Sequence, residues 1–305
     1  MEDRDGFIWF DGEMVPWREA KVHVLTHSLH YGMGAFEGMR AYQTADGTAI
    51  FRLKEHVDRL YGSAHILQMD MPFPREQVQQ ACCDAVTVNG LEEAYVRPLA
   101  FYGSESMGVS APNLKTHIII AAWEWGEYLG DGALERGVRL RTSSFARHHI
   151  NVTMCRTKAT GNYINSMLAL REAQACGYDE ALLLDVDGFV AEGSGENIFL
   201  VIDGVIHTPA LTSALAGITR DTLIAIAEEA GYRIVERQIS RDEVYLADEA
   251  FFTGTAAEVT PIRSLDDRQI GAGVRGPVTE ALQKRYFEVV RGEAENYRHW
   301  LTSVD

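Results

Sequence analysis

One lysine stands out as a possible nucleophile. Lys158 begins a segment in which no charged side chain occurs between residues 159 and 170. The Gly161-Asn162 pair indicates a turn, and the apolar residues after it have helical spacing. We therefore expect Lys158 to lie where a strand gives way to a buried helix. Burial disfavours a charged ammonium, and a neutral lysine is nucleophilic towards carbonyl carbons.

Most lysines are solvated, and Lys158 could simply extend into solvent from the start of a helix. The composition favours the chemical interpretation, because the chain contains only five lysines. Of the other four, Lys54 and Lys284 lie in charge-rich helical segments. Lys115 follows a turn signal, and Lys21 starts an alternating segment. If any lysine forms a Schiff base in this protein, Lys158 is the candidate.

Further segments could serve a ligand that carries a phosphate. Residues 216–219 open a helix, whose first N–H groups form an anion site, and residues 254–256 end a strand in small residues. Glu192 could be solvated or could pair with a buried cationic nitrogen, and residues 193–195 after it are more typical of a tight turn than of a cradle. Arg59 could contact a phosphate, although an arginine on a helix face is more often solvated. With Lys158, these features supply a reactive amine, two phosphate cradles and a carboxylate.

Composition limits the class of protein. A chain of 305 residues can form two domains. The net charge of −16 repels phosphate backbones and argues against a nucleic-acid partner. No apolar run reaches membrane-spanning length, the N-terminus is acidic and unlike a signal peptide, and the four cysteines lack metal-ligand spacing. We predict a cytoplasmic protein that binds no metal and no membrane.

The first 125 residues are expected to form an α+β unit dominated by strands. Asp11-Gly12 between apolar runs predicts a hairpin. Hairpins are expected at residues 7–17 and 38–53 and strands at 22–26, 95–102 and 117–123, with helices at 54–67 and 74–87. We assign residues 1–125 to a small N-terminal domain.

Three glycines between residues 125 and 133 indicate a linker, which we place at residues 126–134. The remainder, residues 135–305, is expected to form a larger C-terminal domain. Its expected strands are at 138–143, 181–185, 197–202, 233–239 and 249–253, with helices at 218–231 and 277–290.

Seven segments, in the same order, resemble the fold-type IV pyridoxal-phosphate enzymes, and among them the branched-chain amino acid aminotransferases. These segments are residues 31–40, 56–60, 95–98, 158–163, 192–199, 217–220 and 254–262. The lysine, Glu192-Gly-Ser-x-Glu-Asn and Gly-Thr segments are typical of the fold type. Tyr95-x-Arg-Pro and Gly254-Thr-Ala-Ala-Glu-Val point to the branched-chain group. The resemblance implies a two-domain mixed fold whose C-terminal domain is β-barrel-like and carries helices.

The resemblance also implies pyridoxal 5'-phosphate as the cofactor. Lys158 would bond to its aldehyde and move a proton between Cα and C4′, while Glu192 would keep the pyridine nitrogen protonated. Tyr163 would hydrogen-bond the ring hydroxyl oxygen. The implied phosphate contacts are Arg59, Ile218, Thr219, Thr255 and the N–H of Ala256.

For the substrate, the resemblance assigns the α-carboxylate to Tyr95 and to the N–H groups of Thr255 and Ala256. Arg97 would receive the second carboxylate of glutamate. It is two residues from Tyr95 and therefore on the same side of a strand, although it could instead be a structural arginine supporting Pro98. The remaining implied substrate contacts are Tyr31, Phe36, Arg40, Met107, Val109, Trp125 and Tyr128.

Tyr31 and the loop of Met107 and Val109 reach into the partner subunit's site in relatives, which implies a homo-oligomer, either a dimer or a dimer-based hexamer. The implied reaction is transamination between leucine, isoleucine or valine and 2-oxoglutarate. Alternatives on the same fold are a D-amino acid aminotransferase, an R-selective amine transaminase and an aminodeoxychorismate lyase-like enzyme, against which the Tyr95 motif argues. A non-catalytic binding protein is the alternative of another class, and the presence of Lys158 argues against it.

Overall fold

The computed structural model describes residues 4–126, 129–130 and 132–304. Contacts between Cα atoms divide the chain into two compact units. Unit 1 comprises residues 1–125, 157–161 and 289–305, and unit 2 comprises residues 126–156 and 162–288. Such a division does not test which part folds independently, so the domains expected at 1–125 and 135–305 stay a prediction.

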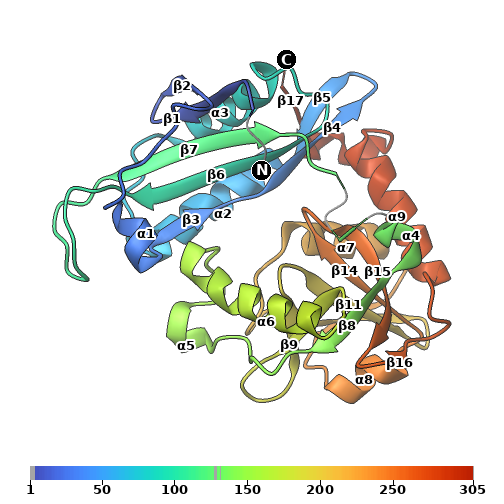
Figure 1. The fold of residues 1–305 in the computed structure, drawn as a ribbon. Coiled ribbons are helices and arrows are strands. Elements are labelled where there is room, and N and C mark those ends of the chain that lie inside the picture. The colour runs from blue at the N-terminus through green and yellow to red at the C-terminus, as the bar shows by residue number, and fades with distance from the viewer. Residues whose placement is uncertain (1–3, 127–128, 131, 305) are drawn as a thin grey trace. The chain divides into compact units, whose positions relative to one another are not determined.

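Unit 1 is built on an antiparallel sheet in the order β17-β5-β4-β6-β7-β1-β2, with β3 also paired to β6 (Figure 1). Its strands are β1 (Phe7–Phe10), β2 (Glu13–Pro16), β3 (Gly34–Phe36), β4 (Met39–Thr44), β5 (Gly47–Phe51), β6 (Ala94–Tyr102), β7 (Thr116–Trp123) and β17 (Leu301–Ser303). Its helices are α1 (His27–Tyr31), α2 (Leu53–Ile66), α3 (Arg75–Thr87) and the 3-10 helix η2 (Glu295–Trp300).

Helices α2 and α3 cover the sheet of unit 1 and close its hydrophobic core. Val57 and Leu60 of α2 and Val78 of α3 are fully buried, as are Ile118 and Ile120 of β7. This burial follows from the amphipathic spacing of both helices, whose apolar residues recur every three or four positions. Both helices lie within one or two residues of their predicted ranges.

One predicted strand of unit 1 is wrong. Residues 22–26 form no strand, and the helix α1 follows them. Val22 and Val24 are 45% and 76% exposed. Alternating β-branched residues favour a strand only where a neighbouring strand completes the ladder, and here the structure provides none for them.

Unit 2 contains a mixed sheet in the order β10-β9-β8-β15-β14-β11-β12-β13, with β16 paired to β15. Its strands are β8 (Val138–Thr142), β9 (Glu180–Leu184), β10 (Val190–Gly193), β11 (Asn197–Ile202), β12 (Val205–Pro209), β13 (Ile234–Arg237), β14 (Glu249–Gly254), β15 (Glu258–Leu265) and β16 (Arg268–Gln269). Its helices are α4 (Ala133–Arg136), α5 (Ile150–Thr153), α6 (Tyr163–Ala175), α7 (Ile218–Glu229) and α8 (Arg241–Leu246). The 3-10 helix η1 (Thr160–Asn162) and α9 (Pro277–Val290) contain residues of both units.

The core of unit 2 comes from strands that are buried on both faces. Strand β11 is buried from Asn197 to Val201, and β14 is buried from Glu249 to Thr253. The two strands pair antiparallel, and the stacked rings of Phe199 and Phe251 lie 5.1 Å apart. Continuous apolar runs are typical of strands covered on both sides.

The expected surroundings of Lys158 are also wrong. The short helix α5 and a turn precede it, and no strand does. The helix α6 that follows is buried on one face only: Ala169 and Ala173 are buried. The predicted apolar residues Ile164, Met167 and Leu168 are 64%, 51% and 42% exposed. Apolar residues at helical spacing show which residues share a face, but not whether this chain covers that face.

None of the helices within the described ranges is long and apolar enough to cross a membrane. Those ranges also contain no group of three or more His, Cys, Asp or Glu side chains suited to a metal ion.

Candidate active site

The backbone on both sides of Lys158 is fixed within unit 1. The N–H of Lys158 donates to Ser63 Oγ on α2 at 3.1 Å, and its carbonyl accepts from the N–H of Phe36 at 3.1 Å. Ala159 forms a bridge with Ala35 on β3. The side chain is half-buried, and its Nζ lies 4.9 Å from the centre of the Phe36 ring. The amine therefore extends from an anchored backbone over an apolar surface.

Arg97 lies over the same aromatic ring as Lys158. Its guanidinium carbon is 4.8 Å from the centre of the Phe36 ring and 5.2 Å from that of Tyr95. Its Nη2 donates to Tyr95 Oη at 3.0 Å, so the prediction that Tyr95 and Arg97 share one side of the strand is confirmed. Arg97 Nε is buried and has no hydrogen-bond acceptor among the residues that the structure describes. An anion that reached this cluster would meet an unsatisfied donor.

Aromatic residues surround Tyr95. The Trp125 ring packs edge-on at 4.5 Å, and the Trp123 ring lies 5.2 Å away. A Cβ on Gly38 would lie 1.9 Å from Tyr95 Oη, so only glycine allows the phenol to occupy this position. Arg40 is directly opposite Tyr95 in the register of β4 and β6, and so faces the same side of the sheet. Tyr128, the third predicted wall, lies outside the described residues.

Arg59 is not a solvated arginine on a helix face. Its Nε and Nη2 donate to the two oxygens of Glu37 at 2.6 and 2.8 Å, and its side chain is 15% exposed. His56 lies three residues earlier on α2, and its Nδ1 is 2.7 Å from Glu37 Oε2. Burial alone would raise the pKa of Glu37, but the Arg59 guanidinium and His56 hold it well below its usual value. Burial lowers the pKa of His56, and because a carboxylate can only accept, its Nδ1 donates to Glu37.

In unit 2, Glu192 is held by two hydrogen-bond donors and one ion pair. A bulge between Val190 and Glu192 shifts the register of β10, and such bulges redirect side chains next to functional sites. Glu192 Oε2 accepts from the Leu215 N–H at 3.0 Å and from the Asn197 side-chain amide at 3.4 Å. Its Oε1 lies 2.7 Å from Arg147 Nε. The side chains of Arg147 and Glu192 are both more than nine-tenths buried. The Glu192 carboxylate is therefore an anion placed inside the protein, where it can pair with a cationic group.

The N-terminus of α7 and the end of β14 are the two predicted anion cradles. Helix α7 begins at Ile218 after Gly217, and no side chain caps its first turn. A Cβ on Gly217 would lie 1.9 Å from Asn197 Oδ1, so this close approach requires glycine. Ile218 and Thr219 are buried, and the first-turn N–H groups together with the helix dipole favour an anion.

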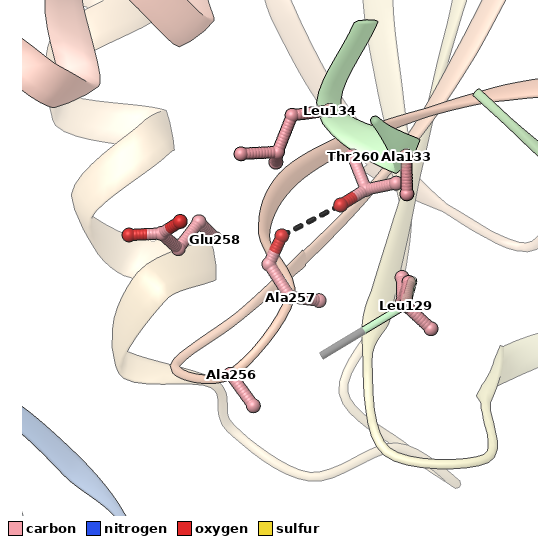
Figure 2. Close-up of a pocket in the computed structure, with 7 residues that line it drawn as sticks. All are labelled: Leu129, Ala133, Leu134, Ala256, Ala257, Glu258 and Thr260. Atoms are coloured by element: carbon pink, nitrogen blue, oxygen red, sulfur yellow. Dashed lines mark hydrogen bonds between the residues drawn. The ribbon is translucent and has the colours of Figure 1, made fainter. Parts of the chain in front are cut away.

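The turn after β14 has a defined backbone. Glu258 adopts a φ of 53°, in the left-handed region, and Thr260 Oγ1 donates to the Ala257 carbonyl at 2.6 Å (Figure 2). Ala256 and Ala257 line a small apolar cavity of about 10 Å³ together with Leu129. The hydrogen bond from Thr260 holds the turn in place beside this cavity. A turn that is held in this way favours fixed directions for its N–H groups.

The residues expected to reach a partner lie together in unit 1. Tyr31 ends α1 and its ring lies 4.4 Å from that of His27, whose Nε2 contacts the carbonyl of Gly108 at 2.9 Å. Met107 and Val109, on either side of Gly108, are 41% and 94% exposed. Helix α1 and this loop therefore form one connected surface. In unit 2, Tyr163 is the first residue of α6 and is half-buried.

Comparison with known proteins decides the family. Residues 34–265 match the family model described as Amino-transferase class IV. The chain is 62% identical over 304 residues to the branched-chain-amino-acid aminotransferase of Pseudomonas aeruginosa, and the match covers 100% of this chain and 99% of that protein. The chain belongs to the branched-chain group of the class IV aminotransferases. This class IV aminotransferase is an enzyme, and not a non-catalytic ligand-binding protein.

Solved structures agree with this membership. The crystal structure of the T.th. branched-chain amino acid aminotransferase with pyridoxamine 5'-phosphate matches this class IV aminotransferase with a TM-score of 0.97, at 51% identity and over 100% of both chains. The same enzyme complexed with N-(5'-phosphopyridoxyl)-L-glutamate gives a TM-score of 0.96 at 50% identity, again over 100% of both chains. The expected fold-type IV class is confirmed.

Inspection of the sequence missed several polar residues around the predicted site of this aminotransferase. Glu37 and Arg147 form buried ion pairs with predicted cofactor residues, and Asn197 supports Glu192. The spacing of His56 and Arg59, three apart on a helix, places both on one face and could have indicated a shared partner. No comparable local signal pointed to Arg147, because it is 45 residues from Glu192 in the chain.

Proposed function

We propose that this enzyme transfers the α-amino group of L-leucine, L-isoleucine or L-valine to 2-oxoglutarate, with pyridoxal 5'-phosphate as its cofactor. The products would be a branched 2-oxo acid and L-glutamate. The observation that supports this best is the cluster in which Lys158 and Arg97 both lie over Phe36. It combines a primary amine, an anion partner and an apolar surface, which a reaction alternating between leucine and glutamate requires.

The described residues fit the proposed cofactor. The first turn of α7 has no side-chain cap among the described residues, and Gly217 before it allows the close approach of Asn197, whose amide supports Glu192. Its phosphate would be held by Arg59, Ile218, Thr219, Thr255 and Ala256. When bound, the cofactor's ring supplies an electron sink for the charge that develops at the substrate Cα. Glu192 would keep the ring nitrogen protonated, and Tyr163 would donate to the ring hydroxyl oxygen.

Lys158 would hold the cofactor through its aldehyde carbon, with loss of water. Once the substrate's amine has displaced it from that carbon, the free amine of Lys158 would carry a proton from the substrate Cα to C4′. Its backbone is anchored by Ser63 and Phe36, so only the side chain has to move between these two atoms. This limited motion favours proton transfer between fixed positions.

Recognition of the substrate would depend on the cluster in unit 1. Tyr95, with the N–H groups of Thr255 and Ala256, would bind the α-carboxylate, and Arg97 would bind the second carboxylate of glutamate. A branched side chain would be contacted by Phe36, Trp125 and Tyr128. Arg40 would complete the substrate contacts from the strand opposite Tyr95.

A homo-oligomer is part of the proposal, with Tyr31, Met107 and Val109 contributing to the site of a partner copy. Their exposure and the contact between His27 and Gly108 support one shared surface. We also propose a cytoplasmic location. The four cysteines are free thiols, and three of them are buried, which suits a reducing compartment.

The experiment that tests the reaction replaces the amine. Lys158→Ala should abolish transamination between L-leucine and 2-oxoglutarate and remove the visible absorbance band that pyridoxal phosphate acquires when bonded to lysine. The matched control is Lys115→Ala, because Lys115 is exposed on a loop of the same unit, and it should keep activity near that of the unsubstituted enzyme. Circular dichroism should be unchanged in both variants.

Activity near normal in Lys158→Ala would remove this lysine from the mechanism. A panel of L- and D-amino acids and primary amines, each with 2-oxoglutarate, then separates the proposed reaction from the alternatives on the same fold. Preference for D-alanine or for an amine without a carboxylate would contradict the branched-chain assignment.

A further inference from the structure

Glu37 is a buried carboxylate for which the proposed reaction has no direct use. Its side chain is 0% exposed. It lies between β3 and β4, where its N–H donates to the Pro98 carbonyl at 2.9 Å. A buried charge without partners destabilises a protein by several kcal/mol, so a carboxylate in this position must be strongly paired.

The partners of Glu37 come from one face of α2. Arg59 donates from Nε and Nη2 in a fork, at 2.6 and 2.8 Å, and His56 Nδ1 is 2.7 Å from Oε2. A two-point contact fixes the plane of a guanidinium as well as its distance. Since this contact uses Nε and Nη2, an oxyanion bound by Arg59 would be met by the other edge of the guanidinium, at Nη1.

Lys158 is anchored by α2 and by the end of β3, the strand that precedes Glu37. Ser63, one helical turn beyond Arg59 on α2, accepts from the Lys158 N–H at 3.1 Å. Phe36, the residue before Glu37, donates to the Lys158 carbonyl at 3.1 Å. Glu37 therefore ties the helix that carries Arg59 to the segment that holds Lys158 in place.

We propose that Glu37 is a positioning residue, which fixes the Arg59 guanidinium in the orientation that receives the cofactor's phosphate and maintains its placement relative to Lys158. The inference rests on the proposed assignment of pyridoxal phosphate and of Arg59 to its phosphate. Glu37 itself touches neither cofactor nor substrate.

Two effects of removing the charge of Glu37 oppose each other. With a neutral residue at position 37, the full charge of Arg59 would be left to attract the phosphate. The guanidinium would, however, no longer be held in a fixed orientation. In Glu37→Gln one oxygen becomes an amide N–H₂, which opposes an Arg59 donor at either position and also His56 Nδ1 at the Oε2 position. Because donors then oppose each other, the fork cannot be kept, and we expect the loss of orientation to exceed the gain in attraction.

The test compares two ligands that differ only by the phosphate. The apo forms of the full-length enzyme and its variants are titrated with pyridoxal 5'-phosphate and with pyridoxal, and binding is followed by visible absorbance. Glu37→Gln should weaken binding of pyridoxal 5'-phosphate by about tenfold to a hundredfold, the scale of one lost charge-assisted hydrogen bond. Binding of pyridoxal should change by less than about twofold to threefold, the usual uncertainty of a single-contact effect.

The matched control is Glu55→Gln on the same helix. Glu55 accepts from Arg52 Nε at 2.8 Å, a similar contact that does not involve Arg59, and affinity for both ligands should be unchanged. Arg59→Gln should show the same selective loss as Glu37→Gln. The double variant should be no weaker than Arg59→Gln alone, because Glu37 acts through that arginine.

Each outcome decides the inference. If Arg59→Gln shows the selective loss and Glu37→Gln shows none, or binds pyridoxal 5'-phosphate more tightly, the role of Glu37 is overturned while the proposed function stands. If Arg59→Gln leaves both affinities unchanged, the phosphate assignment of Arg59 falls and the inference falls with it. Equal loss for both ligands shows a general structural role and also overturns it. Should Glu37→Gln fail to fold, Glu37→Asp, which keeps the charge but withdraws it from the fork, must show the same selectivity.

Discussion

In the proposed reaction, Arg97 would serve two substrates of opposite character. Its guanidinium lies over the rings of Phe36 and Tyr95, at 4.8 and 5.2 Å, and its Nε has no acceptor among the described residues. Cation–π contacts stabilise the charge when an apolar side chain occupies the site. In the proposed reaction, the unsatisfied Nε would give a glutamate carboxylate a partner in the other half-reaction. The aromatic rings would allow the cation to remain when leucine binds.

Arg97→Leu should therefore weaken one half-reaction more than the other. The reaction with 2-oxoglutarate should lose about 2–5 kcal/mol of transition-state stabilisation, the scale of leaving a buried charge unpaired. The reaction with leucine should lose much less. Stopped-flow absorbance of the cofactor measures both half-reactions separately. Equal losses would make Arg97 a scaffold residue that supports the Pro98 end of β6.

Among the elements, α8 shows how an ionised side chain connects a strand to a helix. The helix begins with a capping box in which the N–H of Ser240 donates to Glu243 Oε2 at 2.9 Å. Arg237, at the end of β13, donates from Nη2 to Glu243 Oε1 at 2.6 Å. The hydrogen bond from Arg237 lowers the pKa of Glu243 to about 2. The carboxylate must therefore be ionised for the cap and the ion pair to form together.

Glu243→Gln should destabilise the enzyme by less than about 1 kcal/mol, because the cap is partly exposed and the ion pair is screened. Since the pKa of Glu243 is lower in the folded than in the unfolded state, its contribution is present above about pH 4.5 and is lost as the pH falls towards about 2. Urea unfolding of the enzyme and the variant between these pH values should show the difference shrinking as the pH falls.

The control for this prediction is Glu280→Gln. Glu280 accepts from Arg275 Nη2 at 2.6 Å in a similar ion pair, but its side chain is 61% exposed. Its replacement should change stability less than that of Glu243. A difference between the enzyme and Glu243→Gln that does not depend on pH would show that the cap works without the charge.

At the scale of the whole molecule, exposed apolar side chains gather on particular elements. On and next to α5 and α6 these are Ile150, Val152, Met154, Ile164, Met167 and Leu168, and in unit 1 they include Val24, Leu29, Tyr31 and Val109. Large exposed apolar patches mark surfaces that bind other molecules. They support the proposed association of copies of this chain.

Ile164→Asp should weaken that association, because it places a charge within an apolar patch. We expect the dissociation constant to rise about tenfold or more, the effect of losing one central interface contact. Sedimentation velocity over a range of protein concentrations measures this, with circular dichroism as the test of folding. Val274→Asp is the matched control, since Val274 is 62% exposed, close to the 64% of Ile164, but lies between β16 and α9 and not on α5 or α6. A monomeric enzyme at all concentrations would contradict the proposed oligomer.

Local signals in the sequence determined many elements and singled out one candidate catalytic residue. The hairpin at Asp11-Gly12 formed as predicted, and α9 has the predicted range of 277–290, because turn residues and helical spacing act within a few residues. Lys158 could be singled out because few lysines occur and its neighbours are uncharged. The shared side of Tyr95 and Arg97 followed from the two-residue period of a strand.

Only the tertiary structure decided which groups pair and which surfaces are covered. The alternating residues Val22 and Val24 do not form a strand, because a strand requires a partner that local sequence does not reveal. Glu37 pairs with Arg59 across 22 residues, and Glu192 pairs with Arg147 across 45, so neither buried ion pair has a local signature. Such pairs depend on the folded backbone, which brings distant charges together where water no longer screens them.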